Sequence, residues 1–367
     1  MRECRSLGAA APGEPELFDL PVPSVEPGGA LVETLYSGFS AGTELAYVKG
    51  TAPDFTATRD PDLGVFVPGG SRRFPVTAMG YMEVGRVVQS RRPDLNPGEV
   101  VAAVYGHRSV HALAPDALAV PLPAGLDPLL GVYVAQMGPI CANGLLHAAA
   151  ELQPGVSVEL GDGVRDRCVL VTGGGVVGLL TGLFASACGA REVALADPDP
   201  QRLAVAAALG LVPVDTGEVE LWRWCKQRWA HGAADRGADV VFQCRGQATV
   251  LREALRSLRP QGSVIDLAFY QGGAAELRLG DEFHHNGLTI RCAQIGRVPR
   301  GLAGAWNRRR LSEETVRLLL DRGHDVRRHL VTDVVPLEAA PAVVAALARR
   351  ERSAPGLVIE FPNTAAR

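Results

Sequence analysis

The sequence predicts an α/β protein with a parallel sheet in the middle of the chain and a β-rich part at its N-terminus. Residues 17–134 contain short β-prone runs, such as 30–36, 84–88 and 100–105, separated by Pro and Gly. Regular turn signals of this kind are typical of a barrel or sandwich. After Met137 the composition changes, and apolar strands alternate with helical stretches, which is the β-α-β rhythm of a parallel sheet.

The individual elements follow from this alternation. We expect strands at 167–172, 192–196, 238–243, 263–268 and 288–294, and helices at 141–152, 176–188, 201–209 and 249–258. Strands joined by helices pair in parallel, so these segments predict a doubly wound sheet. Beyond residue 301, helices at 312–322 and 337–350 alternate with strands near 330–335 and 356–361, and we expect this tail to pack on the N-terminal domain.

The length of 367 residues favours two domains over one. We place the β-rich domain at residues 1–142 and 296–367, and the sheet domain at residues 143–295. This division assigns the whole C-terminal tail to the β-rich domain.

Composition excludes several function classes. The chain carries 37 basic and 40 acidic residues, mixed along its length, for a formal charge of −3 at pH 7. No basic stripe for nucleic acid is present, and no run of about 20 apolar residues that could cross a bilayer. Seven scattered cysteines without a Cys-x-x-Cys pair indicate reduced thiols, and the N-terminus lacks the apolar core of a signal peptide. We expect a cytoplasmic protein whose partner is a small molecule.

The strongest chemical signal lies at the first turn of the predicted sheet. Gly173, Gly175 and Gly178 fill the pattern G-x-G-x-x-G between a strand and a helix. Glycines there let the backbone turn tightly and approach a pyrophosphate at the helix N-terminus. The predicted cofactor-binding turn is Gly173, Gly174, Gly175, Val176, Val177 and Gly178.

An acidic residue follows at the position that a dinucleotide site requires. Asp197 ends the next predicted strand, about 20 residues on, where a carboxylate accepts hydrogen bonds from the ribose hydroxyls of NAD. Together with Asp199 it would repel the 2′-phosphate of NADP, so we predict NAD as the cofactor. Arg202 could pair with either acid or contact a phosphate.

Nearly the whole chain resembles the medium-chain dehydrogenase/reductase superfamily of alcohol dehydrogenases. The segments that carry this resemblance are 80–87, 97–101, 173–178, 237–241 and 258–264. Within the superfamily, residues 37–44 and 283–290 resemble the branch of bacteriochlorophyllide dehydrogenase-like and sorbitol dehydrogenase-like enzymes.

The resemblance implies a GroES-like catalytic domain, a Rossmann domain, a cleft between them and a homodimer formed edge to edge through the Rossmann sheets. It implies hydride transfer between nicotinamide and a carbonyl or alcohol carbon. It also implies that Asp197 and Arg202 contact the adenosine ribose and that Cys244, Ala268 and Phe269 lie near the nicotinamide.

The departures from the family pattern concern zinc. Zinc-dependent members hold the catalytic metal with a cysteine, a histidine and a later cysteine or acid. The matching positions here are Ala41, Tyr81 and Cys141, with Met82 where the family has a glutamate. This is not the set of three ligands that zinc needs, so we predict a zinc-independent enzyme.

Without a metal, hydrogen-bond donors must stabilise the developing alkoxide. Tyr81 is the first candidate catalytic residue, as a proton donor or acceptor if its pKa is lowered toward working pH. Thr43 matches the family's proton-relay hydroxyl, and Ser40 is its neighbour. Tyr81 could equally fill a vacant metal cavity. Other candidates are Glu44 and Glu83 as supporting carboxylates, and His107 and His111, which either line a cleft or lie in a solvated loop.

The predicted function is therefore an NAD-dependent, zinc-independent alcohol dehydrogenase or ketoreductase for a small polar or biosynthetic-intermediate substrate. Three alternatives stay open: an enoyl or quinone reductase, a redox-neutral epimerase or lyase that retains NAD, and a pseudoenzyme that only binds ligand.

Overall fold

The computed structural model describes residues 3–152, 159–270 and 272–362. The chain folds into two compact units, one of residues 1–136 and 326–367 (the β-rich unit) and one of residues 137–325 (the Rossmann unit). No helix in the described ranges is both long enough and apolar enough to cross a membrane.

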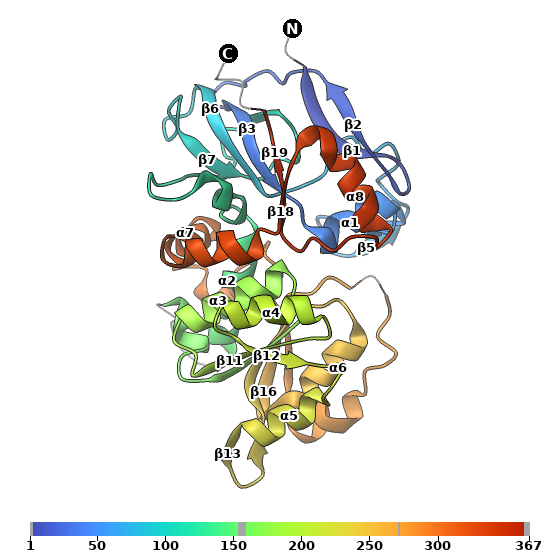
Figure 1. Ribbon diagram of the computed structural model, residues 1–367, viewed down its shortest axis with the longest axis vertical. Helices are drawn as coiled ribbons and strands as arrows, with labels where there is room; N and C mark the ends of the chain where they lie inside the picture. The colour runs from blue at the N-terminus through green and yellow to red at the C-terminus, as the bar shows by residue number, and fades with distance from the viewer. Residues whose placement is uncertain (1–2, 153–158, 271, 363–367) are drawn as a thin grey trace. The chain divides into compact units, whose positions relative to one another are not determined.

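The Rossmann unit is built on a parallel sheet covered by helices (Figure 1). Its strand order reverses beside β10. The order is β12 (Val212–Asp215), β11 (Glu192–Asp197), β10 (Cys168–Thr172), β15 (Ala238–Gln243), β16 (Leu258–Asp266) and β17 (Thr289–Cys292). All five residues of β10 are buried, as expected for a central strand covered on both faces. The predicted doubly wound sheet is confirmed.

Helices cover both faces of this sheet. They are α2 (Met137–Leu152), α3 (Val176–Ala187), α4 (Pro200–Ala208), α5 (Leu221–Arg228), α6 (Ala248–Ser257) and α7 (Arg308–Asp325). Helices α5 and α6 share a core with Cys168 and Leu170, whereas Gly178 of α3 lies against Val171, whose side chain points to the opposite face. A short hairpin of β13 (Ala230–Gly232) and β14 (Asp235–Arg236) follows α5.

The β-rich unit is built on a mixed sheet (Figure 1). Its order is β18 (Asp333–Pro336), β19 (Leu357–Glu360), β3 (Ala30–Gly38), β6 (Glu83–Ser90), β7 (Val100–Ala103) and β9 (Ala119–Pro121), with β8 (Val110–Leu113) also paired to β3. Two hairpins flank it, β1 (Cys4–Ala11) with β2 (Glu14–Leu20) and β4 (Ala57–Arg59) with β5 (Phe66–Pro68). Helices α1 (Ala41–Lys49) and α8 (Ala340–Ala348) contact each other.

One expectation about the C-terminal tail is wrong. Helix α7 belongs to the Rossmann unit, because its apolar residues Leu311, Leu318 and Leu319 are buried and it packs on α2. The approach is so close that a Cβ on Gly138 would lie 2.1 Å from Thr315 Cγ2. The observed division therefore falls at residues 137 and 325, where the sequence suggested 143 and 295.

Candidate functional site

The glycine turn has the backbone geometry that its sequence predicts. Gly173 follows β10 with φ +101°, a conformation that disfavours L side chains. A Cβ on Gly178 would lie 1.8 Å from the Gly173 carbonyl oxygen, whereas a Cβ on Gly175 would meet nothing within 4 Å. Gly175 caps α3, which opens with Val176 and Val177. Gly178 thus closes the helix onto the strand, and Gly175 leaves the turn open to a ligand.

Asp197 lies beside this turn at the carboxyl end of β11. It is 1% exposed, and its Oδ2 accepts a hydrogen bond from the Gly174 amide at 2.7 Å while Oδ1 accepts one from the Asp199 amide at 2.9 Å. Arg202 pairs with both acids, at 3.5 Å from Asp197 and 3.4 Å from Asp199. The structure therefore brings the predicted turn, Asp197 and Arg202 together.

A pocket of about 590 Å³ opens at this edge of the sheet. Gly173, Asp197 and Arg245 are among its lining residues, together with Thr216 and Glu253. Open α/β sheets bind ligands outside the carboxyl ends of their strands, where the strand order reverses. Arg245 was not predicted from the sequence, although its place two residues after β15 puts it at that edge.

The residues assigned to the nicotinamide side by resemblance do not line this pocket. Cys244 donates its backbone amide to Thr172 O at 2.9 Å, Ala268 donates its amide to Asp266 Oδ1 at 2.9 Å, and the Phe269 side chain is 46% exposed. They follow β15 and β16, at the carboxyl ends of the strands. Their role as nicotinamide contacts stays a prediction.

In the β-rich unit, the three predicted catalytic hydroxyls meet. The Tyr81 hydroxyl donates to Ser40 Oγ at 2.5 Å and lies 3.5 Å from Thr43 Oγ1. Ser40 precedes α1 and Thr43 lies in its first turn, so the start of one helix presents both partners to Tyr81.

The pKa of Tyr81 is not lowered toward working pH, so the condition set for a proton acceptor is not met. Burial, followed by the negative charge of Glu44, raises the pKa of Tyr81 to about 12. The hydrogen bonds to Ser40 and Thr43 oppose this rise, and the charge of Glu83 adds a smaller contribution to it. At neutral pH the phenol therefore stays protonated. It can donate a hydrogen bond or a proton, but it cannot serve as a base.

A buried chain of charged groups supports this hydroxyl cluster. Glu44 accepts a hydrogen bond from the Ser40 amide at 2.7 Å, and its other oxygen lies 2.5 Å from His107 Nε2. His107 Nδ1 lies 2.5 Å from Ser37 Oγ, which donates to Glu83 Oε1 at 3.1 Å. Since the serine proton goes to Glu83, the ring must donate from both nitrogens, and His107 is an imidazolium.

The electrostatics agree with that protonation state. Burial alone would lower the pKa of His107, but the adjacent Glu44 carboxylate and then Glu83 outweigh it, and the pKa is raised. Burial raises the pKa of Glu83, and the positive charge of His107 opposes that rise. His107 is fully buried, so both sequence-based placements, in a cleft wall or in a solvated loop, are wrong. His111 stacks on Tyr105 with ring centroids 4.7 Å apart.

Comparison with known proteins relates part of this chain to a family. Residues 176–307 match the family model described as zinc-binding dehydrogenase. This segment of the chain is therefore similar to the zinc-binding dehydrogenases. The predicted resemblance is confirmed at that level.

Individual curated relatives of this chain are distant. D-guloside 3-dehydrogenase of Escherichia coli is 30% identical over 189 residues, covering 49% of this chain and 52% of the relative. The chain thus spans about half the length of the curated relatives it matches.

Solved structures of similar fold match nearly the whole length of this chain. Galactitol-1-phosphate dehydrogenase from Escherichia coli has a TM-score of 0.75 at 16% identity, covering 97% of this chain and 99% of that chain. A Sinorhizobium meliloti structure bound to NADP has a TM-score of 0.73 at 18% identity, covering 98% of this chain and 100% of that chain. These likenesses support the two-part fold.

The zinc implied by the family name does not fit the residues around Tyr81. Ser40, Thr43 and Tyr81 offer neutral hydroxyls that are hydrogen-bonded to one another. Both ring nitrogens of His107 are engaged within the buried chain, and zinc prefers thiolate, imidazole and carboxylate ligands. Cys141, at the predicted third position, is a buried thiol whose pKa burial raises to about 12.

Proposed function

We propose that this protein is an NAD(H)-dependent dehydrogenase that transfers a hydride between the nicotinamide and a carbonyl or alcohol carbon of a small polar substrate, without catalytic zinc. The observation that carries the proposal is the Asp197 carboxylate, held beside the glycine turn at the mouth of the pocket on the carboxyl edge of the sheet. The family match supports the same reaction class.

The choice of NAD rests on the charges around Asp197. A carboxylate has more acceptor sites than the two amide hydrogen bonds occupy, so it can also accept from ribose hydroxyls. A 2′-phosphate would be repelled at the same place. Arg202 already pairs with Asp197 and Asp199, which supports NAD over NADP.

The chemistry of Tyr81 favours reduction of a carbonyl. In that direction the substrate oxygen gains negative charge as hydride arrives, and a protonated phenol can donate to it. In the opposite direction the enzyme needs a base, which a tyrosine with a pKa of about 12 supplies poorly at neutral pH. Ser40 and Thr43 would hold the phenol in place.

The relatives suggest the substrate class. D-guloside 3-dehydrogenase and galactitol-1-phosphate dehydrogenase are named for polyhydroxylated compounds. We propose a ketone flanked by hydroxyl groups as the substrate. We also propose a homodimer, because β17 ends the six-stranded sheet with only one described neighbour, β16, and could pair with a second copy.

The test is turnover by metal-free enzyme. Protein dialysed against chelator, with zinc measured in the same sample, is assayed with NADH and a panel of hydroxyketones. We expect turnover that does not rise when zinc is added back, and a large loss in Tyr81→Phe. Activity that appears only with zinc, in samples whose circular dichroism shows the same fold with and without zinc, would contradict the metal-independent part of the proposal. Absence of NADH oxidation with every ketone would contradict the reaction class.

A further inference from the structure

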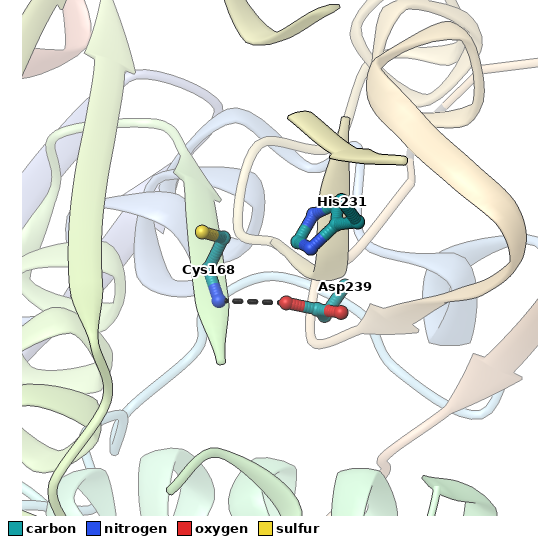
Figure 2. A group of neighbouring side chains, drawn as sticks. All are labelled: Cys168, His231 and Asp239. Carbon is teal, nitrogen blue, oxygen red and sulfur yellow. Dashed lines mark hydrogen bonds between the residues drawn. The ribbon is translucent and has the colours of Figure 1, made fainter. Parts of the chain in front are cut away.

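Three side chains of metal-binding type converge at the amino edge of the Rossmann sheet, opposite the glycine turn (Figure 2). Cys168 begins β10, Asp239 is the second residue of β15, and His231 lies in β13 of the hairpin. Within the described ranges, one ligand atom from each lies within 4.8 Å of the other two. Neither the proposed cofactor site nor the Tyr81 cluster uses these residues.

The backbone holds two of these residues together. Strands β10 and β15 are neighbours, with Val169 paired to Val240, and the Cys168 amide donates to Asp239 Oδ2 at 2.8 Å, the dashed line in Figure 2. Cys168 is buried, and Asp239 is half-buried. The thiol and the carboxylate thus project from fixed positions in the sheet.

His231, in the β13–β14 hairpin, has a tautomer that suits metal binding. His231 Nε2 lies 3.0 Å from Gly237 O, and a carbonyl oxygen only accepts, so Nε2 carries the proton. Nδ1 then has a free lone pair for a metal. Ligating histidines in proteins typically donate their other ring N–H to a carbonyl or carboxylate in this way.

The other two groups also carry supporting partners of the kind found around metal sites. Arg191 Nη2 donates to Cys168 Sγ at 2.7 Å, and Arg259 Nη1 donates to Asp239 Oδ1 at 2.7 Å. Arg259 is balanced by a second acid, Asp235, with which it also pairs. Burial raises the pKa of the Cys168 thiol, and Arg191 opposes that rise by favouring the thiolate.

We propose that Cys168, His231 and Asp239 bind a zinc-like divalent cation at the amino edge of the Rossmann sheet, with three protein ligands and one open position. One thiolate and one carboxylate neutralise a dication, and a sulfur, nitrogen and oxygen set suits zinc rather than magnesium or calcium. Water would complete the tetrahedron. Ligand atoms in a tetrahedral zinc site are about 3.5 Å apart, so binding draws the β13–β14 hairpin toward the ends of β10 and β15.

The test is a cobalt titration of the chelator-treated full chain. Cobalt replaces zinc in such sites, and a thiolate ligand gives it a strong near-ultraviolet charge-transfer absorption. We expect saturation at one equivalent, displacement by zinc, and loss of the absorption in Cys168→Ser. We also expect at least about a tenfold weaker affinity in His231→Gln. The matched controls are Cys292→Ser and His285→Gln, which change an exposed cysteine and an exposed histidine of the same unit.

The two ligand variants together keep the proposal falsifiable. His231 is part-exposed in a short hairpin, so His231→Gln should fold even if Cys168→Ser does not, and circular dichroism of each variant checks this. Absence of a thiolate band in the wild type, unchanged affinity in His231→Gln, or loss of the band in Cys292→Ser would each overturn the site. Because none of these readouts is catalytic, failure here would leave the dehydrogenase proposal standing.

Discussion

The cofactor edge of the Rossmann unit and the Tyr81 cluster of the β-rich unit are built in opposite ways. At the cofactor edge, Asp197 is held by backbone amides from residues 23 or fewer positions away, and a pocket stays open in front of it. In the Tyr81 cluster, side chains 38 to 70 positions apart bond to one another, and the chain from Glu44 to Glu83 is closed to solvent.

This contrast predicts at which of the two sites a substitution can remove function without destabilising the fold. A residue of the open edge can lose its ligand contact while the fold persists. A residue of the closed chain cannot change without leaving another buried charge unpaired. The predictions below probe that difference.

The largest expected effect is a loss of stability at Gly178, where the cofactor edge of the Rossmann unit meets its core. Gly178→Val places a side chain on the Gly173 carbonyl, 1.8 Å from the Cβ position, and should cost more than about 4 kcal/mol of unfolding free energy. Gly175→Ala is the matched control, since its Cβ meets nothing. It should keep the stability and weaken cofactor binding. Denaturant unfolding and a cofactor titration measure the two effects, and equal stability losses would contradict the assigned roles.

The buried chain of charged groups from Glu44 to Glu83 should lose stability when its central cation, His107, is removed. His107→Leu leaves the Glu44 carboxylate without its buried ion-pair partner, which typically costs about 3–5 kcal/mol. We expect this loss in urea unfolding of the variant. His111→Leu provides the control, because His111 stacks on the Tyr105 ring and does not pair with a carboxylate as His107 does. A loss of unfolding free energy below about 1 kcal/mol in His107→Leu would show that these buried charged groups do not stabilise the fold.

Tyr81→Phe should separate chemistry from stability. The variant loses only the hydroxyl that bonds Ser40, so its melting temperature should change little, while the rate of carbonyl reduction should fall about 10²-fold. The wild-type rate should show no tyrosine ionisation across neutral pH, because the Tyr81 pKa is about 12. A variant as active as the wild type would instead support the view that Tyr81 fills a metal cavity.

The smallest expected effect is the pH dependence of stability that His107 and His111 contribute. Burial, followed by the nearby Arg108, lowers the pKa of His111 from 6.5 to about 4. Its stabilising contribution is therefore present above pH 6.5 and lost as the pH falls toward 4. The pKa of His107 is raised, so its contribution is present at low pH and lost as the pH rises through that pKa. NMR titration should resolve the two in this order, and the reverse order would refute the protonated state of His107.

The cofactor edge could be predicted from the sequence because its information is local. Gly173 to Gly178 and Asp197 follow from the strand-turn-helix pattern, and the structure joins them through adjacent strands. Tyr81, Ser40 and Thr43 were found through family resemblance alone. His107 was misplaced, since nothing near it in the chain indicates that Glu44 and Glu83 will enclose it. The pairing of α7 with α2 was missed for the same reason, because amphipathic spacing does not specify which surface a helix covers.

The most direct test of the account is a fluorescence titration of metal-free protein with NADH and, separately, with NADPH. If Asp197 selects the cofactor, NADH should bind at least about tenfold more tightly, a difference of ~1.4 kcal/mol, and Asp197→Asn should reduce that preference. Tighter binding of NADPH, or a preference unchanged in Asp197→Asn, would contradict the proposed role of this carboxylate.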